Sequence, residues 1–253
     1  MAVFGYAHVP WMKRHQALIA ESSLPGAVER YAQVKAIHRI LTQEGGYLAV
    51  GLDHYAALGD ALAKAAASGR LRRGFQGYTT DTAPILIGLG ASAIGSLPQG
   101  YVQNASSAAA FMNAIGSGAR GVELSADDRL RRDAIERVMC DLKVDFEELA
   151  AAHDADPAPL KEAAETGLTR FVADGLADWD GRRLMVKERG RPFLRSIAAL
   201  FDRHLAAAAA PARHSRAVQR GAGRAPGPRP ALDLVRAPTL KLTGLARGRL
   251  AQR

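Results

Sequence analysis

A short glycine-containing stretch, RRGFQGYTTD at residues 72–81, concentrates side chains that could bind or act on a small molecule. Gln76 offers both a hydrogen-bond donor and an acceptor, and Tyr78, Thr79 and Thr80 each offer a hydroxyl. Residues of these types also make structural hydrogen bonds within turns, so a purely structural role stays open. We take these four residues as the leading candidates for a site.

Charged and aromatic residues extend this candidate set. Arg72 and Arg73 could pair with carboxylates, because the planar guanidinium group bonds to both oxygens, although charged loops are usually only solvated. Phe75 could stack on a flat ring, with a place in the core as the alternative. Weaker candidates of the same kinds are His8, Lys13, Arg14 and Arg70.

Asp53 and His54 place a carboxylate beside a group that titrates near neutral pH, which could serve acid–base chemistry. Consecutive side chains of a strand point to opposite faces, however. The pair lies next to a predicted strand, so we expect its two side chains to point apart.

The 253 residues include one cysteine, Cys140. One thiol can form neither an internal disulfide nor a cysteine-rich metal site, and its place on a predicted helix indicates an inert core residue. We therefore expect no metal site and a cytoplasmic setting. The sequence contains no apolar run long enough to cross a membrane, and its start does not resemble a secretory signal.

The net charge of +9 is carried by the last part of the chain. Residues 211–253 contain ten Lys or Arg and one acid, Asp233, whereas the preceding part is balanced. A folded nucleic-acid-binding domain should carry its basic excess on its own surface. This tail is rich in Arg, Gly, Pro and Ala, and we expect it to be disordered.

Residues 1–118 alternate short apolar runs with helical patterns, which predicts parallel strands joined by crossover helices. We expect a strand at Val3–Val9, a helix from Pro25 to Gly45, a strand at Tyr47–Leu52 and a helix ending at Gly69. A buried strand and a glycine-rich loop should follow at residues 85–97, and a short helix after them.

Residues 119–210 form a second predicted domain. Ser125 and Asp128 have the spacing of a helix-capping pair, and two further helices should follow. Asp180-Gly181 then predicts a hairpin turn, and residues 191–205 a closing helix. The order of three helices, a hairpin and a helix is similar to a winged-helix arrangement.

Five blocks in this order resemble the C-terminal portion of oxygen-independent coproporphyrinogen III oxidases, radical S-adenosylmethionine (SAM) enzymes of haem biosynthesis. The resemblance extends over residues 1–218. The blocks are FGYAHVPWMKRHQ (4–16), GLDHYA (51–56), RRGFQGYTTD (72–81), LIGLGASAIGSLPQGYVQN (86–104) and LSADDRLRRDAIERVMCD (124–141).

The resemblance implies a partial, TIM-like barrel of β/α units followed by a mainly helical domain. It implies an enzyme that decarboxylates two propionates of coproporphyrinogen III oxidatively, giving protoporphyrinogen IX, with SAM and a [4Fe–4S] cluster as cofactors. Residues matching its cofactor-binding positions are Ala7, Phe75, Gln76 and Ile94, and the block with Gln76, Tyr78, Thr79 and Thr80 lies by the active site in such enzymes. Arg72 and Arg73 are the candidates for the substrate carboxylates.

The sequence departs from these enzymes at the cluster, which requires three closely spaced cysteine thiolates. With Cys140 alone, the chain is expected to start partway through the barrel and to be inactive by itself. A second chain supplying the missing part of the barrel is one expected partner. The alternative function is a winged-helix-like nucleic-acid-binding module with a basic tail, although we expect no specific nucleic-acid partner.

Overall fold

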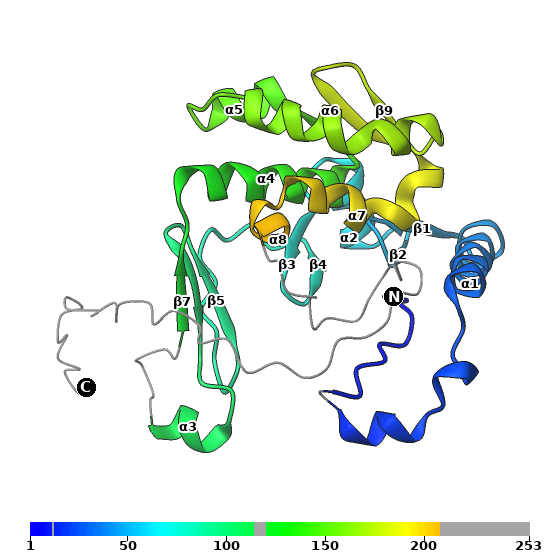
Figure 1. Ribbon diagram of the computed structural model, residues 1–253, viewed down its shortest axis with the longest axis vertical. Coiled ribbons are helices and arrows are strands. Elements are labelled where there is room, and N and C mark those ends of the chain that lie inside the picture. The colour runs from blue at the N-terminus through cyan, green and yellow to red at the C-terminus, as the bar shows by residue number, and fades with distance from the viewer. Residues whose placement is uncertain (12, 114–119, 208–253) are drawn as a thin grey trace. The chain divides into compact units, whose positions relative to one another are not determined.

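The computed structural model describes residues 1–11, 13–113 and 120–207, which form two compact units (Figure 1). The first unit combines residues 1–83 with residues 124–207, and the second consists of residues 84–123. Helices and strands are mixed, and the described strands form small separate sheets with no closed barrel among them.

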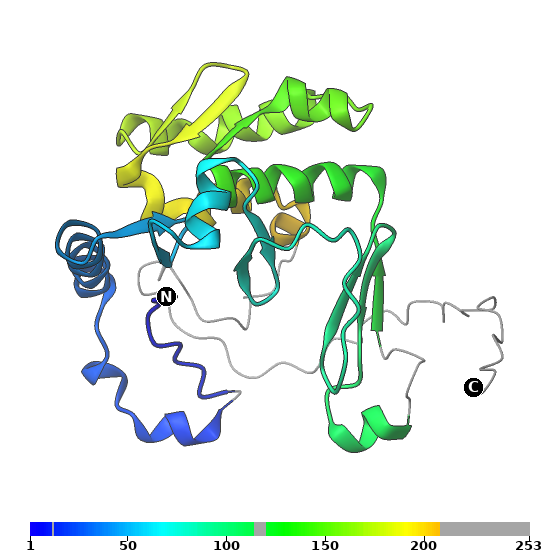
Figure 2. The same cartoon turned by 180° about the vertical axis from the view of Figure 1, so that it is seen from behind.

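The helical part of the first unit is built on α4, whose neighbours α5 and α6 lie along one side of it (Figures 1 and 2). Its elements are α4 (Ala126–Asp141), β8 (Lys143–Asp145), α5 (Phe146–Ala152), α6 (Ala158–Ala173), β9 (Ala177–Trp179) and β10 (Arg183–Val186). The strands form an antiparallel sheet in the order β8-β10-β9. Gly181, at φ +88°, lies in the predicted hairpin turn between β9 and β10.

One apolar core holds this part together. Phe146 begins α5, is fully buried, and packs its ring 5.1 Å from that of Phe201 and 5.6 Å from that of Trp179. Leu130 of α4 and Leu160 of α6 are buried in the same cluster, as their helical spacing predicts. Burying each large side chain stabilises the fold by about 1.5–3 kcal/mol.

Two helices of this part begin at side-chain caps. The predicted pair at the start of α4 is confirmed, because Ser125 Oγ accepts from the Asp128 N–H and Asp128 Oδ2 accepts from the Ser125 N–H. Asp145 caps α5, with Oδ1 accepting from the N–H groups of Glu147 and Glu148. Both caps satisfy N–H groups that have no partner within the helix.

The predicted closing helix is broken into shorter pieces. The segment consists of η4 (Glu188–Phe193), α7 (Leu194–Ala198), η5 (Ala199–Phe201) and α8 (Arg203–Ala207). Pro192 lies inside η4, where its ring and missing N–H disfavour a continuous α-helix. The sequence therefore predicted helical structure here but not its interruption.

The remaining part of the first unit contains short helices and two hairpins. Its elements are η1 (Arg14–Leu18), η2 (Glu21–Ser23), α1 (Ala27–Arg39), the π-helical η3 (Ile40–Glu44), β1 (Tyr47–Val50), β2 (His54–Ala57), α2 (Ala61–Ala67), β3 (Arg72–Gly74) and β4 (Gly77–Thr79). The two predicted helices are confirmed, since the first ends before Gly45 and the second before Gly69, which has φ +65°.

The prediction of parallel strands is wrong, since every strand pair of the described residues is antiparallel. β1 and β2 are joined directly by residues 51–53. A parallel crossover needs about a dozen residues or more, whereas a hairpin needs about two. The alternation of apolar runs and helices was correctly observed, but the run after Tyr47 contains a tight turn.

The strand predicted at Val3–Val9 is also absent. Ala2 pairs with His54 as an isolated bridge, and the Val3 N–H donates to the Asp53 carbonyl at 2.8 Å. Residues 4–9 continue without a strand partner among the described residues. An apolar run needs a neighbouring ladder to become a strand, and here the ladder ends after one bridge.

The apolar side chains of α1 are largely exposed, including Val28, Tyr31 and Val34. Their helical spacing predicted one apolar face, and in the described structure that face is not buried. Contiguous exposed apolar surface of this kind commonly marks an interaction site.

The second unit contains one antiparallel sheet in the order β5-β6-β7. Its elements are β5 (Ile94–Leu97), β6 (Gly100–Gln103), the predicted short helix α3 (Ala108–Asn113) and β7 (Arg120–Glu123). We expected a buried strand within residues 85–97. That prediction of burial is wrong, because Ile87 and Leu89 are exposed. Gly95 does allow close backbone approach, since a Cβ there would lie 2.9 Å from the Leu86 carbonyl oxygen.

No helix among the described residues is long and apolar enough to span a bilayer. The predicted disorder of residues 211–253 concerns a segment outside the described residues.

Replacing Asp145 with alanine should destabilise the chain by about 1 kcal/mol at neutral pH, because α5 loses its cap. Burial raises the pKa of Asp145, but hydrogen bonds from Arg183, the Glu148 N–H and Arg182 outweigh it and hold the pKa below its usual value. A depressed pKa means stability that is present above about pH 4 and lost as the pH falls further. Denaturant unfolding across this range should show the difference from wild type shrinking in acid.

Asp145→Asn is the matched control, because asparagine keeps the capping oxygen without the charge. At neutral pH, Asp145→Asn should lower the free energy of unfolding by less than Asp145→Ala does. Equal losses that do not change with pH would contradict an electrostatic contribution from Asp145.

Candidate functional site

The stretch with most candidate residues forms the β3–β4 hairpin, which lies against α4 (Figure 2). Tyr78 anchors it from inside the core. Its hydroxyl donates to the Met139 carbonyl at 2.8 Å and accepts from the Leu52 N–H at 2.9 Å. Gly51 allows this position, because it has φ +57° and a Cβ there would overlap the Tyr78 ring. Tyr78 thus joins the hairpin, the β1–β2 turn and α4.

Burial raises the pKa of Tyr78, and the nearby Arg73 guanidinium offsets this only in part. The hydroxyl therefore stays protonated near neutral pH. With both of its hydrogen-bonding capacities used by backbone groups, it is a positioning group in this structure.

Glu136 of α4 holds the other strand of the hairpin. Its Oε1 accepts from the Arg73 N–H at 3.0 Å and lies 3.4 Å from Arg72 Nε. The Arg73 guanidinium carbon lies 4.6 Å from the centre of the Tyr78 ring, in a cation–π contact. Arg73 Nη1 is buried and has no hydrogen-bond partner in the described residues. The two arginines are thus oriented by α4 and Tyr78.

The tip of the hairpin is open to solvent. Phe75 is 55% exposed, and Gln76 is exposed beside it. Thr79 Oγ1 accepts from the Asp81 N–H at 3.0 Å, whereas Thr80 is exposed. The hairpin therefore places Phe75 and Gln76 together at its tip, while Tyr78 faces inward and the two threonines lie where the chain leaves the hairpin.

The Asp53 and His54 side chains meet, contrary to expectation. Asp53 Oδ1 lies 2.7 Å from His54 Nδ1, and the two side chains are 17% and 15% exposed. Asp53 belongs to the turn before β2, so the alternation of a strand does not apply to it. The His54 ring meets the Tyr78 ring edge-on at 5.0 Å. The GLDHYA block thereby contacts the β3–β4 hairpin.

The residues just before the N-terminal block contact GLDHYA, through the bridge from Ala2 to His54. Gln16, which is buried, organises the rest of this block. Its Oε1 accepts from the Val9 N–H at 2.5 Å, and its Nε2 donates to the Ala7 carbonyl at 3.1 Å. Ala7 is exposed beside this loop, whereas Ile94, the other predicted SAM contact, lies half-buried on β5 in the second unit.

The weaker candidates are dispersed over the first unit. His8 Nδ1 is buried without a partner in the described residues, Lys13 and Arg14 are exposed near η1, and Arg70 Nε donates to Ser68 Oγ at 3.1 Å.

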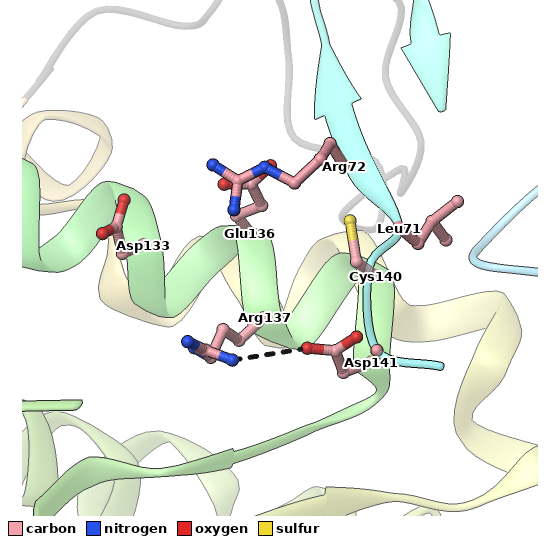
Figure 3. Close-up of a pocket in the computed structure, with 8 residues that line it drawn as sticks. Leu71, Arg72, Asp133, Glu136, Arg137, Cys140 and Asp141 are labelled. Atoms are coloured by element: carbon pink, nitrogen blue, oxygen red, sulfur yellow. Dashed lines mark ion pairs between the residues drawn. The ribbon is translucent and has the colours of Figure 1, made fainter. Parts of the chain in front are cut away.

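A cavity of about 100 Å³ lies between the start of the hairpin and α4 (Figure 3). Arg72 and Arg137 contribute positive charge, and Arg137 Nη1 lies 3.8 Å from Asp141 Oδ2. Burial raises the pKa of Asp141, although Arg137 and Lys143 partly oppose this. The lining residues are Gly69, Leu71, Arg72, Asp133, Glu136, Arg137, Cys140 and Asp141.

Cys140 has the environment of a core thiol. It is 4% exposed, and burial, with Glu136 and Asp141 nearby, raises its pKa to about 12. A metal or cluster needs the thiolate, which is disfavoured here. The described residues contain no group of three or more His, Cys, Asp or Glu side chains that could hold a metal ion.

Sequence reasoning missed the roles of Glu136, Asp133 and Asp141. Their spacing along α4 places them toward one side of the helix, which was visible in the sequence. The contact of Glu136 with the hairpin joins residues more than sixty positions apart, which no local sequence pattern can predict.

Replacing Tyr78 with phenylalanine should destabilise the chain by about 1–3 kcal/mol, because two backbone groups lose their buried partner. Chemical denaturation monitored by circular dichroism measures the change. The matched control is Tyr101→Phe, since Tyr101 is a half-buried tyrosine on β6 of the second unit. Unchanged stability in Tyr78→Phe would contradict the anchoring role.

Residues 124–193 match the family model described as the HemN C-terminal domain. The chain is 46% identical over 208 residues to the oxygen-independent coproporphyrinogen III oxidase of Bradyrhizobium diazoefficiens, covering 81% of this chain and 46% of that protein. It is 43% identical over 208 residues to the enzyme of the same name from Cereibacter sphaeroides, again covering 46% of the relative.

The structure resembles that of coproporphyrinogen III oxidase (HemN) from Escherichia coli, described as a radical SAM enzyme. The TM-score is 0.73 at 32% identity, and the match covers 80% of this chain and 48% of that one. The chain thus spans about half the length of the relatives that it matches.

Proposed function

Because this chain is related in sequence and structure to the C-terminal part of oxygen-independent coproporphyrinogen III oxidases, we propose that it is the corresponding part of such an enzyme. The proposed reaction is oxidative decarboxylation of two propionates of coproporphyrinogen III to protoporphyrinogen IX. The observation that carries the proposal is the convergence of GLDHYA and RRGFQGYTTD, which Tyr78 joins through its bond to Leu52. These relatives favour an oxidase over the nucleic-acid-binding alternative.

In this proposal the exposed hairpin tip contacts the ligands. Gln76 supplies a donor and an acceptor, and Phe75 an aromatic face, for SAM. Ala7 and Ile94 are carried as proposed SAM contacts only because they match cofactor-binding positions of these enzymes. The hydroxyls of Thr79 and Thr80 line the neighbouring part of the site, and Tyr78 positions the hairpin beneath it.

Arg72 and Arg73 are proposed to attract the carboxylates of the substrate. Arg73 Nη1 has no hydrogen-bond partner in the described residues, which is consistent with a donor that binds a carboxylate of the substrate. Arg72 is oriented by Glu136, 3.4 Å from its Nε. The chemistry on the propionate itself requires groups that this chain does not supply.

The residues present do not fit a [4Fe–4S] cluster. Such a cluster is held by several cysteine thiolates, whereas this sequence has one cysteine, buried and with a raised pKa. We therefore assign no step of the reaction at the cluster to this chain. A second polypeptide with the first half of the relatives' sequence is the proposed source of the cluster site.

The exposed apolar residues of residues 1–48 support such a partner. They include Phe4, Trp11, Leu18 and Val28, whereas the apolar residues of α4–α7 are mostly buried. Water-exposed apolar surface of this extent favours association. We propose that this surface packs against the polypeptide that completes the barrel.

The finer assignments of the fold belong to the same proposal. We infer that residues 1–118 correspond to the C-terminal part of a radical SAM β/α barrel and residues 119–210 to a winged-helix-like domain. The sheet order β8-β10-β9, with α5 and α6 between β8 and β9 in sequence, supports the second assignment.

Anaerobic reconstitution of this chain with iron and sulfide should yield no [4Fe–4S] absorbance. Co-expression with the first half of the Bradyrhizobium diazoefficiens relative should yield a complex that binds a cluster and forms protoporphyrinogen IX from coproporphyrinogen III. The first half alone is the control, and it should bind a cluster without turnover. A cluster on this chain alone, or no complex in the co-expression, would contradict the proposal.

Within that complex, Gln76→Ala should lower turnover about tenfold, corresponding to one lost hydrogen bond in the site. Gln43→Ala is the matched control, because Gln43 is an exposed glutamine of η3. Thermal unfolding of both variants should match that of the unmodified chain. Equal turnover in Gln76→Ala and Gln43→Ala would contradict a role of Gln76 in the site.

A further inference from the structure

The Asp53–His54 pair is a built arrangement that the proposed function does not yet use. Nδ1 and Oδ1 lie 2.7 Å apart, and both side chains are mostly buried, at 15% and 17% exposure. An ionised carboxylate only accepts hydrogen bonds, so Nδ1 carries the hydrogen and donates it. In the neutral imidazole this leaves Nε2 unprotonated, as an acceptor.

The surrounding chain fixes the imidazole in place. His54 pairs with Val50 of β1 on one side and forms a bridge with Ala2 on the other. The Tyr78 ring meets it edge-on at an interplanar angle of 81°. The Asp53 carbonyl accepts from the Val3 N–H, so the backbone of the carboxylate is held as well.

Nε2 faces the backbone of the hairpin beside Gln76. A Cβ on Gly77 would lie 3.1 Å from Nε2, so glycine, here at φ +137°, avoids a side chain crowding that nitrogen. No hydrogen bond to Nε2 is formed within the described residues. Two polar groups around the turn have partners of their own: the Tyr78 hydroxyl bonds to the backbone, and Arg191 donates to the Gly51 carbonyl at 2.5 Å. The Arg73 guanidinium packs on the other partner of His54, the Tyr78 ring.

We propose that His54 is a ligand-binding residue whose Nε2 accepts a hydrogen bond from an N–H group of a flat heteroaromatic ligand at the β3–β4 hairpin. Asp53 is the positioning residue that fixes the required tautomer. The proposal rests on the proposed function, which offers two sources of this chemistry: a pyrrole N–H of the tetrapyrrole and the exocyclic amine of adenine in SAM. The exposed Phe75 at the hairpin tip supplies an aromatic surface for either ring.

The test uses the full 253-residue chain with two stable probes, coproporphyrin III and S-adenosylhomocysteine. Calorimetric titration with each probe identifies the source of the N–H group. Asp53→Asn should lower by about threefold to tenfold the affinity for the probe that binds. The asparagine amide can donate to Nδ1, which moves the hydrogen to Nε2. His54→Phe keeps a ring against Tyr78 and should lower the affinity for the same probe to a similar extent.

Two measurements separate this role from a structural one. Proton–nitrogen correlation spectra at about pH 8, where histidine is ordinarily neutral, should show hydrogen on Nδ1 in the wild type and on Nε2 in Asp53→Asn. Asp128→Asn is the matched control, since it alters a second His–Asp pair, with 2.8 Å between His204 Nε2 and Asp128 Oδ1. It should leave probe affinity unchanged.

Each outcome decides the proposal. Weaker probe binding in both Asp53→Asn and His54→Phe, with circular dichroism spectra of folded protein, supports the proposal. The probe whose affinity falls then identifies the ligand class. Unchanged affinity in Asp53→Asn and His54→Phe, or hydrogen on Nε2 in the wild type, overturns the role of His54 while leaving the proposed function standing. A wild-type chain that binds neither probe overturns ligand binding by this chain, and the role of His54 with it.

Discussion

The hydroxyl of Tyr78 is the interaction on which the site depends. It bonds at once to the backbone of Leu52 and of Met139, so it connects the β1–β2 turn, the β3–β4 hairpin and the end of α4. A two-stranded hairpin is marginally stable alone in water, and this one has three residues in each strand. Its order is therefore supplied by α4, through Tyr78 and the Glu136 carboxylate.

Local signals predicted the elements whose formation is decided locally. The capping pair of Ser125 and Asp128, the helix end at Gly69 and the turn at Gly181 all depend on residues within a few positions of one another. The parallel strands and the strand at Val3–Val9 were mispredicted, because strand pairing depends on which segment lies alongside. Apolar composition gives no information on that neighbour.

In the candidate site, too, local features were predicted and features that depend on tertiary structure were missed. Residue types singled out Gln76 and Phe75, which the structure places together at an exposed tip. The inward position of Tyr78 could not be predicted, since it follows from packing between distant segments. The contact between Asp53 and His54 was missed because Asp53 belongs to the turn before β2, where strand alternation does not apply. A polar residue in a turn and a polar residue that anchors a turn have the same local signature.

The ring of Tyr78 occupies the volume that a side chain at position 51 would need. The two positions are therefore sterically coupled. A larger residue in place of Gly51 would be accepted only with a smaller one in place of Tyr78, and that exchange would also remove the hydroxyl that joins three segments. The missing side chain at position 51 is thus the steric condition for the tyrosine at position 78.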